Sequence, residues 1–138
     1  MVRYGLGTDL VEIARFSEWQ HKSHAQLIRI LSPQEISYAL ASPAKSAERF
    51  AVRFAAREAF FKALHDLLPE VRVPLLTVLR NVQVTHAANG APQLVINWSA
   101  LNNNNVHTQH TIDGMHITAK LSLTHTHTLA TATVLLLI

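Results

Sequence analysis

The sequence predicts an α+β protein, with helices in the first half of the chain and strands in most of the second half. Two patterns lead to this prediction. Residues 46–65 are rich in Ala and place Phe side chains at helical spacing, whereas residues 115–124 alternate apolar and polar residues as a strand does. The length of 138 residues suits one domain. We therefore expect a single domain, residues 1–138, that contains a long helix and an antiparallel sheet.

The first element is expected to be a strand over residues 3–13. In a strand, Gly7, Asp9 and Val11 would share one face, which places an acidic side chain on a largely apolar ribbon. After residue 13 the spacing becomes helical, because Phe16 and Trp19 are three positions apart. A helix over about residues 11–24 is the expectation there.

Two Ser-Pro pairs predict the next helix starts. Ser32 and Glu35 form a capping box with Pro33 at the first helical position, since the Ser side chain accepts from the Glu35 N–H and the Glu reaches back. A second start at Ser42 opens the longest helix, which runs to about residue 65 and cannot continue through Pro69.

The second half is expected to hold four strands, over residues 77–86, 92–98, 115–124 and 129–138. The segment "AANGAP" supplies a turn between the first two, with Gly90 and Pro92 as turn residues. A second turn near His125 separates the last two strands. The run of Asn at residues 102–105 is expected to be an exposed loop.

Composition limits the class of protein. The chain is 49% hydrophobic and 15% charged, which supports a packed core and excludes the usual signature of disorder. It contains no Cys, so disulfides, thiolate metal sites and cysteine nucleophiles are excluded. Neither end contains an apolar run long enough for a signal peptide or a membrane span. We expect a soluble cytoplasmic protein without membrane attachment.

The formal net charge of +3 favours anionic partners such as phosphates, acidic proteins or nucleic acid. A nucleic-acid-binding domain is the least favoured of these, because the sequence has no clustered basic stripe with interleaved aromatic residues. We therefore expect no nucleic-acid partner.

The candidate chemistry lies in the long helix and the first strand. Glu58 and Lys62 are four residues apart and lie on one helix face, which by itself describes an ordinary surface ion pair. Asp9 by itself is most simply a turn or cap residue. Together, Asp9 and Glu58 are the kind of carboxylate pair that holds Mg²⁺ against a substrate phosphate, with Lys62 one turn away to neutralise phosphate charge.

At this point the chain resembles a known family, the holo-acyl-carrier-protein synthases, which are the short phosphopantetheinyl transferases. The resemblance rests on "GLGTDLVEIARF" at residues 5–16, "RFAAREAFFKAL" at residues 53–64, "NGAP" at residues 89–92 and "LSLTHT" at residues 121–126. It implies the fold of that family, with the sheet packed on the long helix. It also implies transfer of the phosphopantetheine arm of coenzyme A to a serine of an apo acyl carrier protein, with release of adenosine 3′,5′-bisphosphate.

The resemblance assigns roles residue by residue. Asp9 and Glu58 are expected to bind Mg²⁺, Lys62 to meet the leaving phosphate, and His125 to lie beside the phosphates of the coenzyme. The other expected coenzyme contacts are Arg53, Arg57, Gly90, Pro92 and Ser122. Arg15 matches a basic residue of the surface on which the carrier protein docks. The resemblance also implies a homotrimer with sites between subunits, so that His125 and the "NGAP" turn face Asp9, Glu58 and Lys62 of a neighbour.

Several alternatives remain open at the level of sequence. The serine can be activated by Glu58 directly, or by a metal-bound water in contact with Glu58 or Asp9. Arg57 stands where the family has lysine, which admits a non-catalytic module that binds coenzyme A or a carrier protein. A transition-metal site at His125 and His127 is less favoured, because no third ligand with matching spacing is evident.

Overall fold

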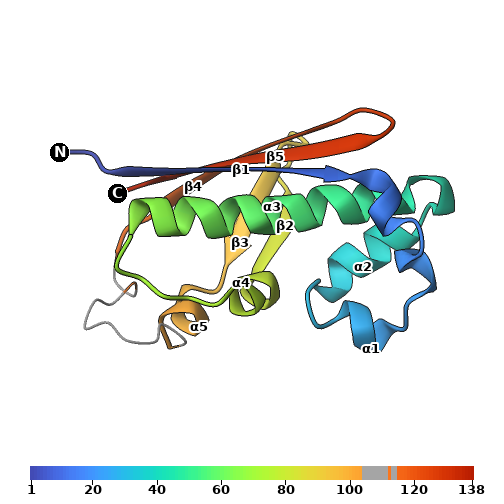
Figure 1. Cartoon of the computed structure of the whole chain (residues 1–138), viewed down its shortest axis with the longest axis horizontal. Helices are drawn as coiled ribbons and strands as arrows, with labels where there is room; N and C mark the ends of the chain where they lie inside the picture. Colours follow the sequence, from blue (N-terminus) through green and yellow to red (C-terminus); the bar gives the residue numbers. More distant parts are fainter. Residues whose placement is uncertain (104–111, 113–114) are drawn as a thin grey trace.

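A long helix lies along a three-stranded antiparallel sheet in the computed structural model, which describes residues 1–103, 112 and 115–138 (Figure 1). The strands are β1 (Tyr4–Glu12), β2 (Val82–His86), β3 (Pro92–Ile96), β4 (Thr118–His125) and β5 (Leu129–Leu137). The α-helices are α1 (His24–Leu27), α2 (Pro33–Leu40), α3 (Ser46–Leu67), α4 (Leu75–Asn81) and α5 (Trp98–Asn103). Short 3₁₀ turns occupy Ile13–Phe16, Trp19–His21 and Pro43–Lys45. The predicted α+β class is confirmed.

The backbones of β1 and α3 touch, and two glycines make this possible. A Cβ atom on Gly7 would lie 1.9 Å from the carbonyl oxygen of Ala59, and one on Gly5 would lie 2.2 Å from that of Ala63. Any larger residue would force the strand away from the helix. This close approach brings the next inward residue of β1, Asp9, beside the middle of α3.

The three-stranded sheet has the order β1-β5-β4, with Asp9 opposite Ala132 and Ser122 opposite Thr133. The predicted alternation of β1 is confirmed, because Gly7, Asp9 and Val11 are all buried. The opposite face of β1 carries apolar side chains that are more than half exposed: Tyr4, Leu6 and Leu10 at 66%, 54% and 62%. One face of the sheet therefore covers α3 while the other remains open and partly apolar.

The predicted helix over residues 11–24 is wrong. Strand β1 continues to Glu12, and Ile13 N–H then donates to the carbonyl of Thr128, so the chain remains paired with the sheet where a helix was expected. Two 3₁₀ turns follow, and Ser23 starts α1 with a capping box of its own. The two aromatic residues of this segment nevertheless pack together, because the ring centres of Phe16 and Trp19 lie 4.7 Å apart.

The expected strand over residues 77–86 is only half right. Pro74 precedes helix α4, which ends at Asn81, and only Val82–His86 are extended. Strands β2 and β3 pair with each other through a turn in which Gly90 has φ +84°. They form a separate two-stranded sheet, so the single sheet suggested by the sequence is divided in two.

The helix start predicted at Ser32 is confirmed, whereas the longest helix begins four residues after the predicted start at Ser42. The Ser32 side chain accepts from Glu35 N–H and the Glu35 carboxylate accepts from Ser32 N–H, and α2 begins at Pro33. After Ser42 a 3₁₀ turn leads directly into α3. Asn102 and Asn103 belong to α5, and the other half of the expected Asn loop lies outside the described residues. Among the helices of the described chain, none is both long and apolar enough to cross a membrane.

Candidate active site

Asp9 and Lys62 form the centre of the candidate site. Lys62 Nζ donates to Oδ1 of Asp9 at 3.0 Å and to the carbonyl oxygen of Thr8 at 2.9 Å. The Asp9 side chain is 9% exposed and that of Lys62 is 50% exposed, so the pair lies at the border between core and solvent. The structure thus brings together the acidic strand residue and the helix lysine that the sequence singled out.

Glu58 shares this environment with Asp9. Partial burial and the negative charge of Asp9 raise the pKa of Glu58 above its ordinary value of 4.5, and the positive charges of Lys62 and Arg15 oppose the rise. Two carboxyl groups so close together repel each other when both are ionised. The site therefore favours either a shared proton or a cation between them.

The donor set fits a hard divalent cation such as Mg²⁺. Oδ2 of Asp9 is buried and has no hydrogen-bond partner in the described part of the chain, which leaves one carboxylate oxygen available as a ligand. Mg²⁺ takes one or two carboxylates from a protein and completes its shell with water and substrate phosphate. Asp9 and Glu58 supply two carboxylates of this kind.

A transition-metal site receives no support from the described residues, which contain no group of three or more His, Cys, Asp or Glu side chains able to share a metal. His125 instead lies 3.2 Å from a carboxylate oxygen of Glu48. The second histidine of the alternative hypothesis, His127, lies in the exposed β4–β5 turn.

A second group of candidate residues lines a small pocket of about 170 Å³ between α2, α3, β2 and β4. The basic and imidazole side chains that line it are Lys45, Arg49, Arg53, His86 and His125. One acidic residue, Glu48, is also present. Because cationic and imidazole donors dominate its lining, the pocket can accept a phosphate group.

Arg53 is the buried cation of this pocket. Its side chain is 4% exposed, its Nη1 donates to the carbonyl of Arg49, and its Nε has no hydrogen-bond partner in the described structure. The guanidinium carbons of Arg49 and Arg53 lie 4.1 and 4.6 Å from the centre of the Tyr38 ring. Sequence reasoning predicted Arg53 and His125 but missed Lys45, Arg49 and His86. The sequence pattern that could have indicated this pocket is the recurrence of basic residues every four positions from Lys45 to Arg53.

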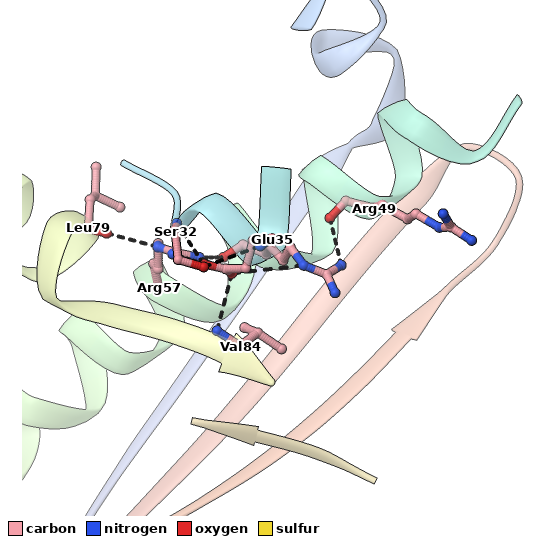
Figure 2. A network of polar contacts seen from close by, with 7 residues as sticks. Ser32, Glu35, Arg49, Arg57, Leu79 and Val84 are labelled. Atoms are coloured by element: carbon pink, nitrogen blue, oxygen red, sulfur yellow. Dashed lines mark hydrogen bonds and ion pairs between the residues drawn. The ribbon is translucent and has the colours of Figure 1, made fainter. Parts of the chain in front are cut away.

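The structure corrects the expectation for Arg57. This side chain is 1% exposed and donates to both carboxylate oxygens of Glu35, through Nη1 at 2.8 Å and through Nη2. Its Nε donates to the carbonyl of Leu79 and Nη1 also reaches that of Arg53 (Figure 2). Arg57 therefore joins α3 to α2 and α4, and its guanidinium is committed to this network instead of a nucleotide.

Glu35 is the acceptor at the centre of that network. Burial alone would raise the pKa of Glu35, but the hydrogen bonds and charge of Arg57, together with the N–H groups of Ser32 and Val84, bring it below its ordinary value. The carboxylate is therefore ionised at neutral pH, and it forms ion pairs with two buried guanidinium groups, since Arg53 Nε also lies 3.8 Å from its Oε2. Sequence reasoning identified Glu35 only as a helix cap, because nothing local shows that it also meets a residue 22 positions away.

The remaining predicted residues lie on three different elements. Arg15 is exposed in the first 3₁₀ turn, close enough to Glu58 to lower its pKa. Gly90 and Pro92 lie in and beside the β2–β3 turn. Ser122 is exposed on β4 and, by strand alternation, faces away from the side of the sheet on which His125 lines the pocket.

The acidic pair and the Arg53 pocket are separate within one chain. Asp9 belongs to β1 and His125 to β4, and β5 lies between these strands in the sheet. None of Asp9, Glu58 and Lys62 lines the pocket. A ligand that uses both groups must therefore be long, or must take them from two copies of the chain.

Comparisons with known proteins agree with these features. The model of the 4'-phosphopantetheinyl transferase superfamily matches residues 5–130. The holo-[acyl-carrier-protein] synthase of Treponema denticola is 33% identical over 132 residues, which cover 96% of each chain. The holo-[acyl-carrier-protein] synthase of Geobacter sp. (strain M21) is 50% identical over 62 residues. This match covers 44% of this chain and 49% of the relative, about half of each.

The fold is also found among solved structures. The structure described as the Chronobacterium ammoniagenes ACPS-CoA complex has a TM-score of 0.72 and 25% identity, with 96% of both chains covered. The family match extends from β1 into β5 and includes both the acidic pair and the Arg53 pocket. On this evidence the chain belongs to the 4'-phosphopantetheinyl transferase superfamily.

Proposed function

We propose that the protein is a Mg²⁺-dependent holo-acyl-carrier-protein synthase. It transfers the 4′-phosphopantetheine arm of coenzyme A to a serine of an apo acyl carrier protein and releases adenosine 3′,5′-bisphosphate. The observation that carries this proposal is the meeting of Asp9, Glu58 and Lys62, one of them from a strand and two from a helix, at the border of the core. Coenzyme A is also the ligand named for the related Chronobacterium ammoniagenes structure.

Asp9 and Glu58 would hold Mg²⁺ in this site. The bound cation would neutralise the diphosphate of coenzyme A and the charge that develops on it during transfer. Lys62 keeps one ammonium group at the same place, and its half-exposed side chain is able to turn from Asp9 towards a phosphate oxygen.

The reaction exchanges one phosphorus–oxygen bond for another. The serine oxygen forms a bond to the β-phosphorus, the bond from that phosphorus to the bridging oxygen breaks, and the bisphosphate leaves with the bridging oxygen. The serine proton must pass to a base. The proposed base is Glu58 itself or a water on the cation in contact with Glu58 or Asp9, because these carboxylates lie where the phosphate would be held.

The Arg53 pocket is the proposed site for the phosphate-bearing nucleotide end of coenzyme A. Arg53 is fixed by burial and its guanidinium stacks on Tyr38, so it offers a positive charge at little conformational cost. His125 and Lys45 add donors at the edge of the pocket. Gly90, Pro92 and Ser122 remain proposed coenzyme contacts on neighbouring elements.

We propose a homotrimer in which each complete site combines two subunits. Two features support this assembly. The Asp9–Glu58 pair and the Arg53 pocket are separate within one chain, and the outer sheet face exposes an apolar row of Tyr4, Leu6 and Leu10 that a second subunit would cover. Light scattering of the purified protein should therefore give a trimer mass. A fully active monomer would contradict this arrangement.

The proposed setting is the cytoplasm, where the enzyme would serve fatty acid or related synthesis. The carrier protein is acidic in this proposal, and Arg15 contributes to its docking surface. Arg15 is exposed and lies near Glu58, so a carrier protein bound there would bring its serine towards the candidate base.

The decisive experiment combines the protein with an apo acyl carrier protein, coenzyme A and MgCl₂, followed by mass spectrometry of the carrier protein. A mass gain of one phosphopantetheine group, lost when a chelator is added and restored by Mg²⁺, supports the enzyme. The alternative is a non-catalytic module that binds coenzyme A or a carrier protein. No mass gain with several carrier proteins, despite measurable binding of coenzyme A, would establish that alternative.

A further inference from the structure

A second cavity, of about 370 Å³, lies on another part of the molecule. It is formed by the end of the α1 region, the start of α2, the end of α4 and the β2–β3 strands where they are farthest from their turn. This volume is in the range of small-molecule sites. Its apolar walls are Ile28, Leu31, Pro33, Val82, Val95 and Ile96.

The apolar side chains at this cavity remain accessible. Val95 is 47% exposed and Ile28 is 40% exposed, whereas Leu31 and Val82 are buried at 4% and 1%. The cavity therefore has an open apolar entrance and a closed apolar interior. An aliphatic chain placed here would be removed from water by contacts on several sides.

The polar part of the lining carries no carboxylate. Its side chains are two arginines, three amides and one hydroxyl: Arg57, Arg80, Asn81, Gln83, Asn97 and Ser32. Arg80 is exposed, and its Nε donates to the carbonyl of Arg29 at 3.2 Å. Its two terminal nitrogens make no hydrogen bond within the described structure. They form the two-pronged donor that suits a carboxylate.

Arg57 supplies one more donor at the floor of the cavity. Four of its five N–H groups are used, since Nε reaches Leu79, Nη1 reaches Glu35 and Arg53, and Nη2 reaches Glu35. The second N–H of Nη2 has no acceptor among the described residues, although the side chain is 1% exposed and lines the cavity. Glu35 is the acidic partner of both Arg57 and Arg53, whereas Arg80 is the cation of the lining that has no acidic partner within the described structure.

From this arrangement we propose that the cavity is a binding site for a small amphipathic carboxylate, such as a medium-chain fatty acid. The aliphatic chain lies against Leu31, Val82 and Ile96, and the carboxylate accepts from Arg80. The site is separate from the proposed transfer site, because it shares no lining residue with the Arg53 pocket and contains none of Asp9, Glu58 and Lys62. The inference therefore holds whether or not the transfer reaction is confirmed.

The test uses octanoate as the probe and the full chain. Titration calorimetry should show saturable binding, and amide NMR shifts should be concentrated at Val82, Val95 and Ile96. The neutral analogue 1-octanol should bind at least about tenfold more weakly, because it lacks the charge-assisted hydrogen bonds to Arg80. No saturable octanoate binding, or shifts confined to other residues, would overturn the proposal.

A matched pair of variants separates the site from general charge attraction. Arg80→Gln should weaken octanoate binding about tenfold, whereas Arg29→Gln removes the same charge from a neighbouring exposed residue outside the lining and should leave binding unchanged. Both variants should retain wild-type modification of a carrier protein. Equal weakening by the two variants would show that octanoate responds only to surface charge and would refute the assigned site.

Discussion

Nζ of Lys62 lies 3.0 Å from Oδ1 of Asp9, and this contact joins residues 53 positions apart in the chain. It exists because Gly5 and Gly7 allow β1 to touch α3, so that the next inward side chain of the strand meets the exposed edge of the helix. The contact places an ammonium group and a carboxylate together at the centre of the proposed site.

Glu58→Gln should preserve the fold and reduce carrier-protein modification by about a hundredfold or more, because the amide is neither a proton acceptor nor a good Mg²⁺ ligand. Initial rates from the mass assay measure this loss. Glu18→Gln, which neutralises an exposed acid outside the site, is the control and should behave as wild type. Undiminished activity of Glu58→Gln would remove Glu58 from the mechanism.

Lys62→Ala should lower kcat more than it raises KM for coenzyme A, since the proposed lysine acts chiefly on charge that develops as the phosphate leaves. Removal of one such donor commonly costs about a hundredfold in kcat. Steady-state kinetics with coenzyme A as the varied substrate separate the two parameters. A change confined to KM would make Lys62 an anchor for the ground state.

The raised pKa of Glu58 leads to a prediction about how pH and Mg²⁺ together affect the stability of the fold. Its folded-state pKa is raised, so its contribution to stability is intact below pH 4.5 and is lost as pH rises through the raised pKa. Without Mg²⁺, Glu58→Gln should therefore raise the Tm at neutral pH but not in acid below that point. Adding MgCl₂ should raise the Tm of the wild type more than that of the variant. Thermal unfolding with and without MgCl₂ checks both statements, and a destabilised variant at neutral pH would contradict them.

The Glu35–Arg57 pair should be essential for stability. Glu35→Gln leaves the buried Arg57 without its carboxylate, which typically costs about 3 to 5 kcal/mol, whereas Arg57→Met leaves Glu35 with only its longer contact to Arg53. Urea unfolding measures each loss, and Arg29→Met provides an exposed control. The double variant Glu35→Met/Arg57→Met should cost less than the sum of the two single changes. Additive losses would show that the two side chains act independently.

Local sequence patterns predict the start of α2, the turn at Gly90 and the inward row of β1. Each depends on neighbouring residues: Ser32 and Glu35 cap one helix, Gly90 accepts positive φ, and strand alternation places Gly7, Asp9 and Val11 on one face. The position of Glu58 and Lys62 on one face of the helix was also predictable, because four residues make about one turn of helix. Asp9 is linked to these two residues by its chemistry and by the family resemblance, because sequence spacing does not show that it lies near them.

The role of Arg57 and the end of strand β1 depend on contacts between distant parts of the chain. Residues 11–24 have helical spacing, but pairing of β1 with β5 keeps the chain extended to Glu12. Arg57 looks like a ligand residue in the sequence, yet Glu35 on another helix occupies its guanidinium. Such contacts join residues that are far apart in the chain, and only packing determines which buried charge finds which partner.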